Sequence, residues 1–230
     1  KLLNKLSYIL NIETSTTNCS VSISENGLLI GLKEDNSLQY SHAECLHIYI
    51  DEVLKVANVS KSQIAAIGVS KGPGSYTGLR IGVSAAKGLC YALKIPLISI
   101  PTLESLALQV TNPEGPIVAM LDARRSEVYS AIFDISRNEI RQTQAEIITL
   151  NSYNEILNSS PVYFIGSGVT KTQELISHPN ARFIKNKLPS ASQMCKLTHG
   201  KFIADDFEDI AYFEPYYLKD FIAIPSKKQF

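Results

Sequence analysis

The chain has 230 residues, 45% of them apolar, which is enough to bury a core in one large domain or in two smaller lobes. Its 22 basic and 22 acidic side chains balance to a formal net charge of zero, so charge alone directs the protein to neither nucleic acid nor an anionic membrane, and an RNA contact needs a local patch or a partner. No apolar run reaches the roughly 18 residues of a membrane helix and the first residues lack a signal-peptide pattern, so we expect a cytoplasmic protein.

The first 111 residues predict a β-meander followed by alternating helices and strands. Residues 8–12 form a nearly continuous apolar run, as in a buried strand, and residues 19–24 alternate with period two. Gly27 closes a hairpin signal, and a third strand follows. Beyond it the patterns predict helices over 41–56, 78–93 and from 102, with strands near 64–70 and 95–100.

A proline- and glycine-rich break, "NPEGP", begins at Asn112, and the opening pattern then recurs. A shift of about 109 residues places Asp122 on Glu13 and Ile132 on Ile23. Further helices are expected near 151–157, from about 169 and over 190–202, with a strand at "VYFIG". We therefore predict two similar α/β lobes with mixed sheets, residues 1–111 and 112–230, in the architecture of actin, the sugar kinases and the heat-shock ATPases (the ASKHA fold).

No metal site is predicted. The cysteines Cys19, Cys45, Cys90 and Cys195 form no CxxC pair, and we expect buried reduced thiols. His42 and His47 are five residues apart, which places them about 140° apart around a helix and prevents them from easily sharing an ion.

The loop "KGPGSYTGLR" suggests two roles. It lacks the spacing of a Walker A or dinucleotide loop, but it precedes a helix N-terminus, where free N–H groups attract anions. Lys71, Gly74 and Arg80 are therefore candidates for an anion or nucleotide contact, and the second-half loop Gly166 to Gly168 for an adenosine contact. The alternative is a tight strand-to-helix connection.

Two enzymatic functions remain open as alternatives. One is a stand-alone small-molecule kinase or ATPase, since the turns after Glu13 and Asp122 occupy the places where this fold positions magnesium and phosphate. The turn after Glu13 lacks glycine, however, and Arg124 and Arg125 replace small residues in the other. The second is a serine hydrolase at Ser70, the centre of a GxSxG pattern, although the segment Lys71 to Gly74 intervenes before the helix.

A stripe of small side chains follows the helix 78–93. Such a stripe permits close helix packing, either inside the lobe or, together with the helix 42–57, against another chain. The stripe consists of Gly78, Gly82, Ala85, Ala86 and Cys90.

Three segments resemble the TsaB family: "YILNIETSTTNCSVSI", "GVSKGPGSYTGLRIGVSAAKGLCYALKIPLISIPTLESLA" and "MLDARRSEVYSAIFD". The resemblance is strong over residues 7–134 and continues more weakly in "FIGSG" and "FEPYYLKD". One departure is Glu13, where the family usually has Asp.

The resemblance implies a non-catalytic subunit of the bacterial machinery that makes threonylcarbamoyladenosine beside the anticodon of tRNA. Its partners would be TsaD, a transferase of the same fold, and TsaE, a small ATPase. It would contact tRNA only through the complex. We also expect no cofactor, and a homodimer when the partner is absent, because an apolar face of the helix 78–93 left in water would be a liability. The implied interface is the helical face of the first lobe, with His42, Leu46, Ile50, Gly78, Gly82, Ala85, Ala86 and Cys90.

Overall fold

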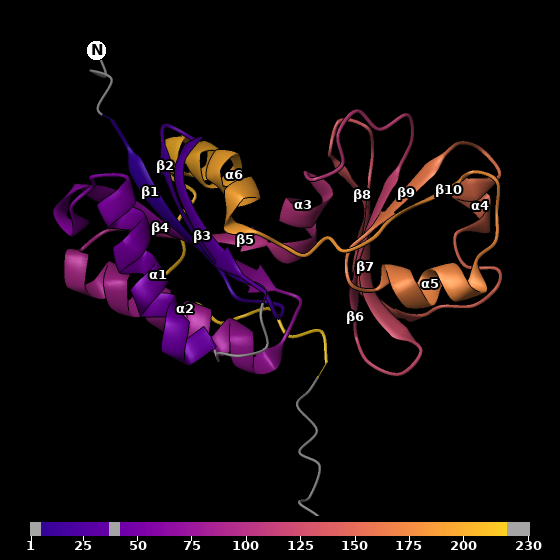
Figure 1. Cartoon of the computed structure of the whole chain (residues 1–230), viewed down its shortest axis with the longest axis horizontal. Helices are drawn as coiled ribbons and strands as arrows, with labels where there is room; N and C mark the ends of the chain where they lie inside the picture. Colours follow the sequence, from indigo (N-terminus) through magenta and orange to yellow (C-terminus); the bar gives the residue numbers. More distant parts are fainter. Residues whose placement is uncertain (1–5, 37–41, 220–230) are drawn as a thin grey trace, which may run out of the picture.

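Two five-stranded mixed sheets lie side by side in the computed structural model, which describes residues 6–36 and 42–219 (Figure 1). In the first sheet, in the order β3-β2-β1-β4-β5, a meander of antiparallel strands continues into two parallel strands. These strands are β1 (Tyr8–Glu13), β2 (Cys19–Glu25), β3 (Leu28–Asp35), β4 (Ile64–Gly72) and β5 (Leu97–Pro101). The apolar run of β1 is buried because this strand lies at the centre of the sheet.

The second sheet repeats this topology. Its order, β10-β9-β6-β7-β8, is the first sheet's order read from the other edge. Its strands are β6 (Ile117–Asp122), β7 (Glu127–Phe133), β8 (Glu139–Ile147), β9 (Val162–Ile165) and β10 (Ala181–Ile184). β6 begins and ends 109 residues after β1, so the predicted repeat and the predicted fold class are confirmed.

Helices cover the first sheet on both faces. In Figure 1, α1 and α2 lie on one face and α6 on the other. The helices are α1 (His42–Val56), η1 (Lys61–Gln63), α2 (Tyr76–Leu93), α3 (Thr102–Ala107), α4 (Asn154–Leu157), α5 (Val169–Leu175) and α6 (Ala191–Ile203). Within residues 6–36 and 42–219, no helix combines the length and apolar character needed to cross a bilayer.

Two helices pack on the sheet that lies in the other half of the sequence. Leu103 and Leu106 of α3 belong to the core formed by strands of the second sheet. Met194 of α6 packs with Ile9 and Ile98 of the first sheet. The break at residue 112 therefore separates the strands of the two sheets, whereas α6 returns to the first one. The division into lobes 1–111 and 112–230 stays a prediction.

The small side chains of α2 were predicted to pack either inside the lobe or against another chain, and the packing of α2 on β1 distinguishes the two. Gly78, Gly82, Ala86 and Cys90 are buried. A Cβ at Gly78 would overlap the carbonyl oxygen of Thr14, and one at Gly82 would overlap the Thr14 hydroxyl. That hydroxyl donates to the Gly78 carbonyl at 2.8 Å. The stripe therefore allows close packing inside the lobe.

Replacing Gly82 by Leu should consequently destabilise the fold. The added side chain must displace α2 from Thr14, and we expect a loss of at least about 1–3 kcal/mol in the free energy of unfolding, measured by urea denaturation. Gly88→Ala is the matched control, because a Cβ at Gly88 meets nothing within 4 Å. It should raise stability by up to about 1 kcal/mol through helix propensity. A Gly82→Leu protein as stable as the wild type would contradict this packing.

Candidate functional site

The loop between β4 and α2 packs tightly against the turn that follows β1. The Ser75 amide donates to the Ser15 carbonyl at 2.6 Å, and a Cβ at Gly74 would overlap that same oxygen. The Ser75 side chain caps α2 by accepting from the Gly78 amide at 3.3 Å. The backbone of the neighbouring turn therefore fills the space beside Gly74, and the structure favours the tight connection over a phosphate cradle.

The two cations of this loop contact the C-terminal segment 204–219, here called the strap. The Lys71 carbonyl accepts from the Tyr216 amide at 2.6 Å. The exposed Arg80 guanidinium lies 4.4 Å from the Tyr76 ring centroid, and its Nε donates to the Tyr217 hydroxyl at 3.3 Å. An anion contact at Lys71 or Arg80 stays a prediction.

Glu13, the acid at the end of β1, is fully buried. Its Oε1 accepts from the Ser15 amide at 2.6 Å and from the Ser70 hydroxyl at 2.9 Å. Its Oε2 has no hydrogen-bond partner in the part of the chain that the structure describes. Burial raises the pKa of Glu13, and the hydrogen bonds from Ser15 and Ser70 only partly oppose that shift. A buried carboxyl group whose pKa is raised is a poor ligand for magnesium.

Ser70 does not have the geometry of a serine nucleophile. It is buried, and its hydroxyl donates to a carboxylate instead of facing substrate. β4 continues to Gly72 and α2 begins only at Tyr76, so the sharp strand-to-helix turn of a hydrolase is missing here. The GxSxG match is a coincidence of strand sequence.

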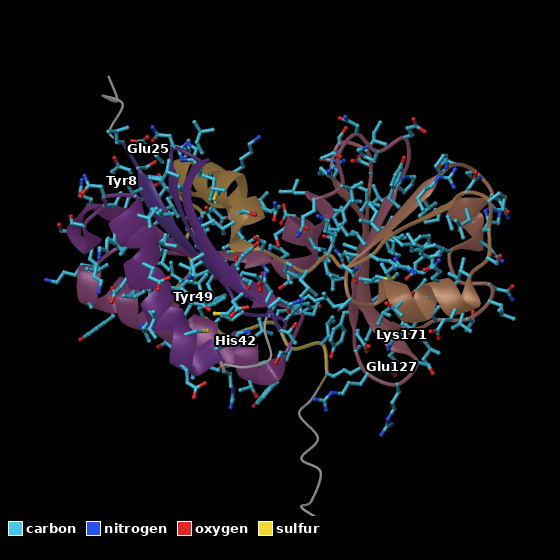
Figure 2. The ribbon with its side chains drawn as sticks, viewed as in Figure 1. Tyr8, Glu25, His42, Tyr49, Glu127 and Lys171 are labelled. Atoms are coloured by element: carbon cyan, nitrogen blue, oxygen red, sulfur yellow. The ribbon has the colours of Figure 1, made fainter. Side chains whose placement is uncertain are left out.

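The corresponding acid of the second lobe, Asp122, forms an ion pair. Its Oδ1 lies 2.7 Å from Lys171 Nζ and accepts from the Arg124 amide at 2.6 Å. Figure 2 shows Lys171 beside Glu127, whose carbonyl this lysine also contacts. Asp122 is therefore exposed and paired with a lysine, in contrast to the buried Glu13.

The glycines of the second-half loop serve packing. A Cβ at Gly166 would overlap the Met120 carbonyl oxygen, and one at Gly168 would crowd Met120 and Val128. Both glycines are buried. Both glycines thus allow close packing against β6, and an adenosine contact at Gly166 and Gly168 stays a prediction.

The histidines do not form a metal site. His42 Nε2 lies 2.7 Å from the Thr16 carbonyl oxygen, whereas His47 is exposed. Across residues 6–36 and 42–219 there is no group of three or more His, Cys, Asp or Glu side chains able to hold an ion.

The outward face of α1 and α2 carries a shallow groove of about 440 Å³. It is lined by Ala43, Leu46, His47, Ile81, Ser84, Ala85, Gly88 and Leu89. Among the predicted interface residues only Leu46 and Ala85 line it. His42 is half-buried, and Ile50, Gly78, Gly82, Ala86 and Cys90 are buried inside the lobe.

The groove lies on the two helices predicted for the interface, whereas most of the predicted residues lie inside the lobe, and the interface itself stays a prediction. A second series of positions, Ile81, Ser84, Ala85 and Gly88, follows the same three- and four-residue steps on the outer side of α2. This second series can be read from the sequence, but the stripe through Gly82 has the same spacing and was interpreted as the interface instead.

Comparison with known proteins supplies the family. The family model for "TsaD: tRNA N6-adenosine threonylcarbamoyltransferase" matches residues 36–220. The tRNA threonylcarbamoyladenosine biosynthesis protein TsaB of Bacillus subtilis is 30% identical over 176 residues, which cover 73% of this chain and 74% of that protein. The TsaB of Escherichia coli is 27% identical over 233 residues, covering 96% and 99% of the two chains.

Solved structures show the same fold. A Pseudomonas aeruginosa protein described as similar to peptidase YeaZ superposes with a TM-score of 0.82 at 23% identity, covering 93% of this chain and all of that one. YeaZ from the same organism gives 0.79 at 24% identity, covering 92% of this chain and all of that one. With the buried acid, the α1–α2 groove and these relatives together, the chain belongs to the TsaB family of tRNA threonylcarbamoyladenosine biosynthesis proteins, within the larger family that the TsaD model describes.

Proposed function

We propose that this protein is a non-catalytic, activating subunit of the complex that makes threonylcarbamoyladenosine beside the anticodon of tRNA. The catalytic partner is an enzyme of the TsaD type, and a small ATPase of the TsaE type completes the complex in the cytoplasm. The observation that carries the proposal is the contrast between the two acids, Glu13 and Asp122, and the outward face of α1 and α2. The acids of the ATPase fold are buried or paired, whereas the helical face of the first lobe is open.

The interior supports a non-catalytic role. Chemistry on a nucleotide needs ionised acids and backbone that can approach phosphate closely. Here Glu13 is sealed under the loop that contains Gly74, and Asp122 is held by Lys171. The acids at the positions that an ATPase of this fold uses are thus buried, in the case of Glu13, or paired with a lysine, in the case of Asp122.

The α1–α2 groove supports the partner assignment. A transferase of the TsaD type, such as that of Staphylococcus haemolyticus, is 36% identical over 114 residues, covering 43% of this chain and 33% of that enzyme. A partner with a related lobe can present a similar helix pair, and small residues such as Ser84 and Gly88 let two helix pairs approach closely. The same face is available for a homodimer when the partner is absent.

A reconstitution tests the proposal. The purified protein, its TsaD-type and TsaE-type partners, threonylcarbamoyl adenylate and an unmodified tRNA are combined, and the modified nucleoside is measured by mass spectrometry. Modification should require this chain, and the chain alone should neither modify tRNA nor hydrolyse ATP. ATP hydrolysis by the pure protein that disappears in Asp122→Ala would establish the kinase alternative instead.

Ser84→Arg should abolish binding to the TsaD-type partner while leaving the protein folded. Ser84 is exposed and lines the groove, so a long charged side chain there holds the two surfaces apart without disturbing the core. We expect at least about a hundredfold loss of affinity, as for a disrupted interface centre. Surface plasmon resonance measures it, with Thr170→Arg on the exposed side of α5 as the control. Equal affinities for the two variants would rule out this face.

Glu13→Gln should stabilise the protein increasingly as the pH rises. Because burial raises the pKa of Glu13, the folded state keeps a proton that the unfolded state releases above about pH 4.5. Wild-type stability is therefore fully present below that pH and is lost as the pH rises towards the raised pKa, by at most about 1.4 kcal/mol per pH unit. Urea denaturation at pH 5, 6, 7 and 8 measures the difference between the two proteins. A difference that does not change with pH would show that Glu13 is ionised.

A further inference from the structure

Two consecutive arginines at the β6–β7 turn adopt left-handed backbone. Arg124 has φ 68° and Arg125 has φ 50°, and both are exposed. Backbone of this kind favours glycine, and a side chain there signals a use that compensates for the disfavoured conformation. The turn itself is closed by backbone groups: the Ala123 amide donates to the Glu127 carbonyl at 3.0 Å, and the Glu127 amide to the Arg124 carbonyl at 3.1 Å.

The guanidinium groups of these arginines are not used by the fold. Among the described residues neither forms an ion pair, and the nearby carboxylates are paired with lysines. Asp122 is held by Lys171, and Glu127 by Lys219. Glycine at both positions would suit this backbone equally well, and the two guanidinium groups lie on the surface without a paired carboxylate in the described residues.

The strap connects the β6–β7 region with the first turn of α2. Lys219 pairs with Glu127, and its Nζ lies 5.7 Å from the Tyr129 ring centroid. Two residues earlier, Tyr217 packs on Tyr76 with ring centroids 4.9 Å apart. Two residues span at most about 7 Å of chain, so the strap joins the two clusters directly. Figure 1 shows the strap in yellow, running along α2 towards the second lobe.

The result is a surface band of cations and aromatic rings. Its members, here called the cationic band, are Tyr76, Arg80, Arg124, Arg125, Tyr129, Tyr217 and Lys219. Burial raises the pKa of Tyr129, and the charge of Arg124 opposes that shift, as expected of close neighbours. Counting Lys171 as well, five cations in this region face three acids, Asp122, Glu127 and Glu214, in a chain whose total charge is zero.

We propose that the cationic band contacts the sugar-phosphate backbone of the tRNA in the assembled complex, an inference that rests on the proposed function. Arginine forks bind phosphate oxygens in pairs, and the half-buried rings of Tyr76, Tyr129 and Tyr217 add aromatic surface beside the cations. Arg80 is already oriented by the Tyr76 ring and the Tyr217 hydroxyl. The tRNA contact is therefore direct, and it draws on both lobes.

The test replaces both arginines by the residue that their backbone prefers. Arg124→Gly/Arg125→Gly should fold at least as well as the wild type, which a thermal melt checks. In the complex with the TsaD-type partner, it should bind an unmodified tRNA transcript about tenfold more weakly near physiological salt. The slope of log K against log salt concentration should fall by about two, one for each lost phosphate contact.

Two control variants define the charge effect. Arg124→Lys/Arg125→Lys keeps both charges and should retain most of the salt slope. Arg182→Ala/Lys196→Ala removes two exposed cations from β10 and α6 and should change neither the affinity nor the slope.

The outcomes separate this inference from the proposed function. Wild-type affinity and slope in the double-glycine variant would overturn the inference, as would a wild-type complex that binds no tRNA. Loss of the TsaD-type partner in that variant would also overturn it, because the band would then be a protein interface. A complex that shows the expected binding but makes no modified nucleoside contradicts only the proposed function.

Discussion

The close contact between α2 and the turn after β1 is the constraint on which the rest of this structure depends. Gly78 and Gly82 let the helix backbone rest on Thr14, and Gly74 lets the preceding loop rest on Ser15. Because the helix is that close, Glu13 is buried beneath the loop, and burial raises the pKa of its carboxyl group. The same contact directs Ser84 and Gly88 outward, where they line the groove. The close packing of α2 thus buries Glu13 and also leaves Ser84 and Gly88 on the outer face.

The second lobe reaches a comparable result by charge. Its sheet repeats the topology of the first, but its acid, Asp122, is held by Lys171 instead of being buried. The arginines that follow it occupy a turn where an ATPase needs small residues. The repeat of an ATPase-like pattern is therefore evidence of fold and not of activity.

Much of the fold was predictable because it follows from local pattern. The apolar runs, the alternation of residues 19–24 and the shift of 109 residues predict two mixed sheets built from the same sequence of elements. The inward face of α2 was not predictable, since small residues recur at helical spacing on both sides, at Gly82 and at Gly88. The strap has no periodic pattern, and its contacts with Lys71 and Glu127 depend on tertiary structure alone. The left-handed arginines carry no signal, because that conformation usually belongs to glycine or asparagine.

The central claim is that this chain supports tRNA modification without contributing catalytic acids. The most direct measurement is the modification rate of the reconstituted complex carrying Glu13→Gln/Asp122→Asn in this chain, followed by mass spectrometry of the tRNA. We expect a rate within about twofold of wild type, because neither carboxylate touches substrate. A fall of about a hundredfold or more, the usual consequence of removing a catalytic acid or base, would contradict it.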